Sequence, residues 1–286
     1  MNVLFWNIDR KNKEGKQQIE GYIINCIDEH DVDIAVFAEY KEKDTKAARG
    51  KINIDRAAIE NGLGNMYEWI TGIEEDGAVT LLARKSLGVV KKICQDDKKR
   101  YSLYVVDTPL KKYLLVAIHL EDRKSDPYSQ RREATIKRLK EAITNNEEDL
   151  DLYSTIVIGD FNANPYDKEL TFMDNMNAVL FKSVIKASEF TCPDTDMVRR
   201  FYNPIIHYLS EDTEMYGSYY YPHPDTYWTP YWCCLDQVLV RKGLVDSIKE
   251  VRYLKDIQGD SLLKATKIPQ PKISDHLPLL VKFEEA

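Results

Sequence analysis

The chain has 286 residues, with 40 Lys and Arg against 47 Asp and Glu, and its 43% of hydrophobic residues excludes a disordered or collagen-like chain. The net charge of −7 argues against a nucleic-acid coat protein, because non-specific binding to phosphates depends on clustered Lys and Arg. It does not argue against an enzyme that cleaves phosphodiesters, because such an enzyme gathers carboxylates around metal ions.

The predicted strands and helices alternate irregularly along the chain. Amphipathic stretches at Gln17 to Asp28 and at Ser129 to Ile143 carry apolar residues every three or four positions, which predicts helices. Several strands follow one another with only a turn between them, so a mixed-sheet α/β layered fold is favoured over a purely parallel doubly wound sheet. The apolar runs of strand length are Val3 to Ile8, Ile34 to Ala38, Ala78 to Ala83, Ser102 to Val106, Leu114 to Ile118, Thr155 to Ile158 and Leu235 to Val240.

Compartment and domain number follow from simple counts. The first nine residues read as a strand, so we expect no secretory signal, and no window of about 18 apolar residues predicts a membrane span. Five cysteines cannot complete a disulfide framework, and reduced thiols in a cytoplasmic protein fit best. No repeat or low-complexity linker marks a boundary, so we expect a single domain over residues 1–286. No Cys-x-x-Cys pair supports a zinc site, whose members would be Cys192, Cys233, Cys234, His207 and His223.

Polar side chains lie at the ends of the predicted strands, where catalytic groups tend to cluster. Each of them alone is typical of a turn or a cap. Together they offer oxygen ligands from separate elements, as Mg²⁺ requires, and imidazoles that titrate at a pKa of about 6.5. The pattern therefore favours a metal site with histidines beside it. The residues are Asn7, Asp9, Glu39, His119, Asp160, Asn162, Asp275 and His276.

The order and spacing of these landmarks resemble the endonuclease/exonuclease/phosphatase superfamily of divalent-metal phosphoesterases, from one end of the chain to the other. The resemblance implies a four-layer α/β (α+β) sandwich, in which two mixed β-sheets pack face to face with helices on the outer faces. It places the site at one end of the sandwich. The matching segments are Phe5-Trp6-Asn7-Ile8-Asp9, Ala38-Glu39, Ile118-His119-Leu120, Gly159-Asp160-Phe161-Asn162, Leu235-Asp236-Gln237-Val238-Leu239 and Ser274-Asp275-His276.

The resemblance also implies which residues bind the metal. Glu39 matches the principal Mg²⁺ carboxylate, and Asn7, Asp9 and Asp275 complete or orient the site. Mn²⁺ is an expected substitute. The metal polarises a phosphoryl oxygen in the implied reaction, which is in-line attack of water on phosphorus without a covalent intermediate.

The catalytic residues are implied in the same way. Asp160 matches the acid that orients or deprotonates the attacking water, and Asn162 is placed to donate to a non-bridging oxygen. His276 matches the histidine beside the scissile phosphate, with Asp236 fixing its ring and favouring the imidazolium. His119 matches a second histidine of the deoxyribonuclease and sphingomyelinase branches.

Substrate contacts are expected outside this set. Arg100 matches a basic position of the family, although it is also typical of a surface residue. The aromatic-rich residues 190–232 are predicted to be an insertion whose side chains mostly pack a small core, with one or two at the lip of the cleft. Tyr227 and Trp228 are the candidates for stacking on the substrate.

The expected activity is a nuclease that cleaves DNA or RNA. Ala117 to Leu120 stand where abasic-site endonucleases carry Tyr-x-Pro-Asn, which argues against that branch. The segment Trp232 to Gln237 lacks the Arg of the inositol polyphosphate 5-phosphatases. One alternative is a phosphatase or phosphodiesterase for a small nucleotide, a sugar phosphate or a lipid head group. The other is an inactive binding module, against which the intact residue set argues. The oligomeric state stays open.

Overall fold

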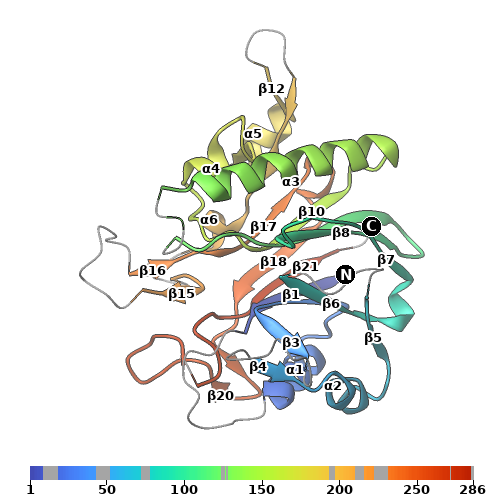
Figure 1. Ribbon diagram of the computed structural model, residues 1–286, viewed down its shortest axis with the longest axis vertical. Coiled ribbons are helices and arrows are strands. Elements are labelled where there is room, and N and C mark those ends of the chain that lie inside the picture. The colour runs from blue at the N-terminus through green and yellow to red at the C-terminus, as the bar shows by residue number, and fades with distance from the viewer. Residues whose placement is uncertain are drawn as a thin grey trace.

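Two mixed β-sheets form the centre of the structure, and helices lie on both outer faces (Figure 1). This computed structural model describes residues 1–8, 19–42, 52–71, 78–123, 126, 128–192, 197–209, 216–221, 231–270 and 272–284. In Figure 1, helices α3, α4 and α5 lie above the sheets, and α1 and α2 lie below them. Strands of one sheet contact strands of the other, as β1 does β10 and β6 does β9. The predicted sandwich of two mixed sheets is confirmed.

The first sheet has six strands in the order β18-β21-β1-β2-β6-β5. The pair β1 and β2 is parallel, and the other pairs are antiparallel. Helix α1 (Ile19–Glu29) buries Ile19, Ile23, Cys26 and Ile27, the spacing of one apolar helix face, and helix α2 (Arg56–Gly62) adds Ile59 to the same core. The strands are β1 (Asn2–Asn7), β2 (Ile34–Ala38), β5 (Tyr67–Trp69), β6 (Val79–Arg84), β18 (Ile248–Tyr253) and β21 (Leu279–Phe283).

The second sheet has seven strands in the order β11-β14-β17-β10-β9-β8-β7. Its pairs β9 with β10 and β11 with β14 are parallel. Helix α3 (Gln130–Asp149) covers its outer face, followed by α4 (Lys168–Thr171) and α5 (Lys182–Ala187). The strands are β7 (Val89–Gln95), β8 (Tyr101–Asp107), β9 (Lys112–His119), β10 (Thr155–Asp160), β11 (Ala178–Val179), β14 (Phe201–Tyr202) and β17 (Asp236–Val240).

Short elements complete the described chain. A helix, α6 (Ile205–Tyr208), packs beside β18, and two single 3-10 turns are present at Lys85–Leu87 and Lys242–Leu244. The other strands form two-stranded ribbons at the periphery. These ribbons pair β3 (Tyr40–Glu42) with β4 (Ile52–Ile54), β12 (Phe190–Thr191) with β13 (Val198–Arg199), β15 (Tyr219–Tyr220) with β16 (Trp232–Cys233), and β19 (Asp256–Ile257) with β20 (Asp260–Ser261).

Strand β9 shows how the sequence pattern builds the layers. Leu115 and Ala117 belong to the core between the sheets, whereas Leu114, Val116 and Ile118 belong to the core under α3. Successive side chains of a strand point to opposite faces, so a strand covered on both faces reads as a continuous apolar run. Within the described residues, no helix is both long and apolar enough to cross a membrane.

The structure extends the predicted elements in several places. Helix α3 continues to Asp149, past the predicted end at Ile143, and Glu147 in this added part is buried. The edge strand β7 was not predicted from the sequence, because its lysines interrupt the apolar pattern. The predicted insertion at 190–232 is not wholly separate from the core, because Phe201 and Tyr202 form strand β14 of the seven-stranded sheet.

The buried pair of Glu147 and Arg241 gives a stability prediction. Arg241 donates to both carboxylate oxygens of Glu147 at 2.8 and 2.9 Å, and the two side chains are only 4% and 3% exposed. Arg241→Leu leaves a buried carboxylate without its partner, so we expect the free energy of unfolding to fall by about 3–5 kcal/mol in urea denaturation. Lys249→Ala, which breaks an exposed pair with Glu284, is the control and should cost less than about 1 kcal/mol. Equal losses for the two variants would contradict the prediction.

Candidate active site

Strand ends from both sheets meet at one edge of the sandwich. In the six-stranded sheet Asn7 ends β1 opposite Ala38, the residue before Glu39. In the seven-stranded sheet Asp160 at the end of β10 is paired with His119 on one side and with Asp236 on the other. Because the two sheets pack face to face, these side chains converge from opposite layers.

Asn7, Glu39, His119 and Asp160 form one contact group across the two sheets. The Asn7 amide donates to Asp160 Oδ2 at 3.1 Å and to Glu39 Oε1 at 3.5 Å. His119 Nε2 lies 3.2 Å from Glu39 Oε1 and 3.8 Å from Asp160 Oδ2. The pKa of His119 is raised, because the Glu39 and Asp160 carboxylates outweigh the lowering effect of burial. Residues from four strand ends therefore share one site.

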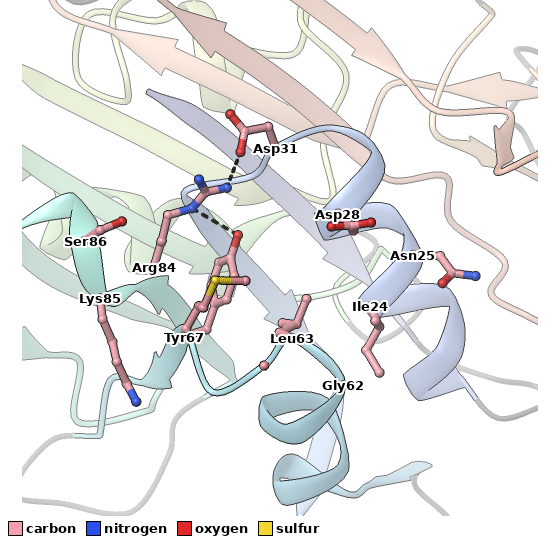
Figure 2. Close-up of a pocket in the computed structure, with 12 residues that line it drawn as sticks. Ile24, Asn25, Asp28, Asp31, Gly62, Leu63, Tyr67, Arg84, Lys85 and Ser86 are labelled. Atoms are coloured by element: carbon pink, nitrogen blue, oxygen red, sulfur yellow. Dashed lines mark hydrogen bonds and ion pairs between the residues drawn. The ribbon is translucent and has the colours of Figure 1, made fainter.

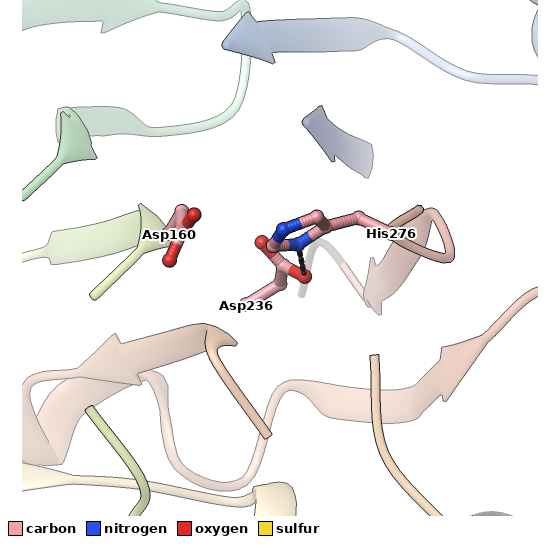
Figure 3. A group of neighbouring side chains, drawn as sticks. All are labelled: Asp160, Asp236 and His276. Atoms are coloured by element: carbon pink, nitrogen blue, oxygen red, sulfur yellow. Dashed lines mark hydrogen bonds and ion pairs between the residues drawn. The ribbon is translucent and has the colours of Figure 1, made fainter. Parts of the chain in front are cut away.

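Asp236 and His276 form a second group beside the first (Figure 3). Asp236 Oδ2 lies 2.7 Å from His276 Nδ1, and the side chains are 0% and 7% exposed. Burial lowers the pKa of His276, but the Asp236 carboxylate outweighs it and raises the pKa to about 10. The pKa of Asp160 is raised by burial and by the charge of Asp236. The imidazole is therefore a cation between buried acids.

The backbone conformation near the strand ends determines where these side chains point. Gly159 has φ +154°, and a Cβ there would lie 2.1 Å from the carbonyl oxygen of Ile118, so only glycine fits before Asp160. Glu39, directly after β2, and Asn162, two residues after β10, adopt φ values of +58° and +48°. Residues other than glycine rarely adopt such left-handed φ values, and those that do concentrate at functional sites.

The donor chemistry of the site fits a hard divalent cation. Carboxylate oxygens of Glu39 and Asp160 both accept from the Asn7 amide, and Asp160, Asp236 and His276 each offer a ligand atom within 4.8 Å of the others. The buried Oδ1 of Asp236 has no hydrogen-bond partner among the described residues. Buried carboxylates this close repel one another, and a cation between them would relieve the repulsion.

A cavity of about 510 Å³ lies at the opposite end of the six-stranded sheet (Figure 2). Arg84 at the end of β6 reaches across it to Asp31 at 2.5 Å and to the hydroxyl of Tyr67 at 3.1 Å. Asp31 precedes the amino end of β2, whereas Glu39 follows its carboxyl end. Among the described residues, none of those that line this cavity was predicted to belong to the phosphoesterase site.

The family model described as "Endonuclease/Exonuclease/phosphatase family" matches residues 4–276. The chain belongs to this family. Members are hydrolytic phosphoesterases that depend on divalent metal ions, so the protein is a phosphoesterase of a metal-dependent family. A search of curated proteins found no match.

Solved structures agree on the fold of this family member. Truncated TDP2 of Caenorhabditis elegans has a TM-score of 0.60 at 14% identity, over 99% of this chain and 96% of that one. TDP2 of D. rerio, complexed with single strand DNA product, has a TM-score of 0.60 at 16% identity, over 99% and 98% of the two chains. An endonuclease/exonuclease/phosphatase family protein from Leptotrichia buccalis has a TM-score of 0.59 at 13% identity, covering 99% of both chains. At these identities the likeness shows the fold alone.

Three more residues that were assigned to the phosphoesterase site adjoin its two contact groups. Asn162 donates its backbone N–H to Asp160 Oδ1 at 2.8 Å and its side-chain amide to the carbonyl of Leu120 at 3.0 Å, so one amide hydrogen points into the loop after β9. The charge of Asp275 favours protonated His276. Arg100 lies beside His119 and forms an ion pair with Glu121 at 3.5 Å. Asp9, Tyr227 and Trp228 lie outside the described residues.

Several residues that support the phosphoesterase site received no assigned role from the sequence. Ser274 donates to the carbonyl of Asn7 at 2.7 Å and accepts from the backbone N–H of His276 at 3.0 Å. The ring of Tyr219 lies 4.8 Å from that of His276. Ser274 belongs to the Ser-Asp-His segment and Tyr219 to the aromatic-rich segment, so the sequence around each of them could have indicated a role in the site. Ser218 and Tyr253, which contact Asp236, carried none.

Gly159 gives a prediction for the path of β10 into the site. Gly159→Ala must shift the strand or its neighbour, so we expect a destabilisation of more than about 1 kcal/mol and a loss of activity of at least about tenfold. Thermal unfolding and steady-state hydrolysis measure the two effects. Gly243→Ala is the control, because a Cβ there meets nothing within 4 Å. A fully active and equally stable Gly159→Ala variant would show that the close approach does not position Asp160.

Proposed function

We propose that the protein is a Mg²⁺-dependent phosphodiester hydrolase, a nuclease that cleaves DNA or RNA by in-line attack of water on phosphorus. The observation that carries this proposal is the convergence on Asp160. Its carboxylate contacts Asn7 and His119, and it lies within 4.8 Å of the pair of Asp236 and His276. A buried base, a cationic imidazole and a set of oxygen ligands are the groups that hydrolysis of a phosphodiester requires.

Glu39 and Asn7, with Asp275 and Asp9, are the proposed ligands of Mg²⁺, and Mn²⁺ is a proposed substitute. When bound, the ion would polarise a phosphoryl oxygen and neutralise the charge that develops there. Glu39 and Asn7 already lie in contact, which supports their assignment to one ion. This assignment rests on the family match and on the oxygen-rich donor set.

Asp160 is the proposed base for the attacking water. Its pKa is raised by burial and by Asp236, which makes the ionised carboxylate a better proton acceptor. His276 uses Nδ1 for Asp236, so Nε2 is the atom left to donate to a phosphoryl oxygen. Asn162 would act beside it through the amide hydrogen that Leu120 does not accept.

A nucleic-acid substrate is supported by relatives of the same fold. TDP2 of D. rerio was solved with a single strand DNA product, and a 3' phosphatase from Neisseria was solved with a product DNA hairpin, at a TM-score of 0.50. The aromatic ring of Tyr219 beside His276 is chemically suited to contact with a base. Arg100, Tyr227 and Trp228 are further proposed contacts.

Two observations favour the second candidate, a phosphatase or phosphodiesterase for a small nucleotide, sugar phosphate or lipid head group. The net charge is −7, and Arg100 beside the site is already paired with Glu121. A small substrate needs no broad basic surface. The complete catalytic set opposes an inactive binding module.

The test is a substrate panel with purified protein, with and without Mg²⁺ or Mn²⁺. The panel holds plasmid DNA, single-stranded DNA, RNA, a bis-aryl phosphate and inositol phosphates, with Asp160→Ala as the inactive control. We expect metal-dependent cleavage of a nucleic acid. Cleavage of the inositol phosphates alone would favour the second candidate, and no metal-dependent hydrolysis of any substrate would reject the proposal.

We also propose a single domain over residues 1–286, with residues 190–232 as a partial insertion, since the family match spans nearly the whole chain. A cytoplasmic location is proposed on the cysteines, which are all free: Cys26, Cys94, Cys192, Cys233 and Cys234.

A further inference from the structure

The pair of Asp236 and His276 spans the two sheets. Asp236 begins β17 of the seven-stranded sheet, whereas His276 lies just before β21 of the six-stranded sheet. Their 2.7 Å contact therefore depends on how the two sheets are held relative to each other. A shift of one sheet by a few tenths of an ångström would lengthen it, and a hydrogen bond weakens with distance.

Tyr253 connects Asp236 to the sheet that carries His276. Its hydroxyl donates to the backbone carbonyl of Asp236 at 2.7 Å, and its side chain is buried. Tyr253 ends β18 and is paired with Leu279 of β21, and the next residue, Leu254, donates to the carbonyl of Pro278 at 2.8 Å. Tyr253 and the segment after His276 therefore belong to one hydrogen-bonded unit, from which the hydroxyl reaches across to Asp236.

Ser218 makes a second connection between the same two segments. Its Oγ accepts from the backbone N–H of Asp236 at 3.1 Å, and its carbonyl accepts from the N–H of Leu277 at 2.8 Å. Ser218 is 0% exposed. The preceding Gly217 packs so closely that a Cβ would lie 2.6 Å from the carbonyl oxygen of Cys233. The segment has little room to move.

We propose that Tyr253 and Ser218 are positioning residues that hold the Asp236 carboxylate at hydrogen-bonding distance from His276 across the two sheets. The backbone of Asp236 is held at its N–H by Ser218 and at its carbonyl by Tyr253, which fixes the point from which the carboxylate reaches the imidazole. Both side chains are buried and act through Asp236. The inference rests on the proposed hydrolysis, in which His276 contacts the phosphoryl group.

Tyr253→Phe tests the inference, and Tyr67→Phe is its matched control. Tyr67 is also a buried tyrosine whose hydroxyl donates to a backbone carbonyl at 2.7 Å, that of Val32, but it lies at the far cavity (Figure 2). We expect Tyr253→Phe to lower kcat by about 10- to 100-fold with little change in KM, as is typical when the residue that orients a catalytic ligand is lost. Tyr67→Phe should keep kcat within about twofold, as expected of a distant and independent site. Equal kcat values for the two variants would overturn the inference.

Two further comparisons separate positioning from general destabilisation. In a His276→Gln background, Tyr253→Phe should cause no further loss of kcat, because both act through one pair. Ser218→Ala should lower kcat, and Ser218→Thr, which restores the hydroxyl, should recover part of it. An undiminished effect of Tyr253→Phe in the His276→Gln background would overturn the inference.

A measurement that does not depend on enzymatic activity tests the inference separately from the proposed function. In metal-free wild-type protein, the proton between His276 Nδ1 and Asp236 should give a strongly downfield ¹H NMR signal. We expect Tyr253→Phe to shift or broaden this signal and Tyr67→Phe to leave it unchanged. An unchanged signal in Tyr253→Phe would overturn the inference, whatever the result of the substrate panel. If the wild-type protein hydrolysed no substrate of the panel, only the proposed function would be rejected.

Discussion

Asp160→Asn is expected to lower kcat for metal-dependent hydrolysis by at least about 10³-fold, while the protein becomes more stable. The substitution keeps the shape of the side chain and an oxygen that can accept from the Asn162 N–H. It removes the base for the attacking water. Single-turnover hydrolysis in Mg²⁺ measures the loss.

The gain in stability follows from the pKa of Asp160, which burial and Asp236 raise in the folded state. A raised carboxyl pKa gives stability that is full below the unfolded pKa of about 3.9 and is lost as pH rises through the folded pKa. At neutral pH, which is above the unfolded pKa, Asp160 therefore destabilises the metal-free protein, and Asn removes this cost. Thermal unfolding of the metal-free variant should show a higher Tm.

Asp107→Asn is the matched control for Asp160→Asn. Asp107 also ends a strand of the seven-stranded sheet, but it is half-exposed, pairs with Lys112 and lies at the opposite end from His119. Its variant should keep full activity. If Asp160→Asn retained more than about a tenth of the wild-type kcat, Asp160 would not be the base.

Asp236→Asn and His276→Gln are each expected to lower kcat by about 10²- to 10⁴-fold, with a combined effect no larger than either alone. The two side chains act as one unit, because Asp236 both orients the imidazole and keeps it protonated. Steady-state kinetics of the two single variants and the double variant measure the coupling. Additive losses would mean that the pair does not act as a unit. His207→Gln is the control that should stay active, because His207 is an exposed residue of helix α6.

The same pair predicts a pH dependence in the metal-free protein. The pKa of His276 is raised to about 10, so its imidazolium gives stability that is full below the unfolded pKa of about 6.5 and is lost as pH rises from there through the folded value. Asp236→Asn removes the largest of the contributions that raise the pKa of His276, so the pKa should fall. An NMR titration of His276 measures this change, and an unaltered pKa in Asp236→Asn would contradict the assigned cause.

The sequence predicted β1, β2, β6, β8, β9, β10 and β17, because each contains an apolar run of strand length. It did not predict β14, since Phe201 and Tyr202 are too few to show a pattern, nor the edge strand β7 with its exposed Lys91. Such strands exist because a neighbouring strand supplies hydrogen bonds, which is a property of the assembled sheet.

The residues of the candidate site were predicted from short local segments and their order along the chain. The contacts between these residues were not predicted. Nothing within either segment specifies that the Asn7 amide reaches Asp160, because the two residues come from different sheets. Tyr253 lies in an ordinary strand pattern, and its link to Asp236 appears only when the sheets are packed. Asp9, Tyr227 and Trp228 lie outside the described residues and remain predictions, whereas the ring of the described Tyr219 lies beside that of His276.

The pairing of β1 with β21 determines when during synthesis the enzyme can become active. The first and last described strands lie side by side, and the amino group of Met1 donates to the carbonyl of Phe283 at 2.8 Å. Among the described strands β1, which ends in Asn7, is translated first, and β21, which follows His276, is translated after all the others. The site therefore cannot assemble on a nascent chain until β21 has emerged and paired with β1, so the phosphoesterase can become active only after that step.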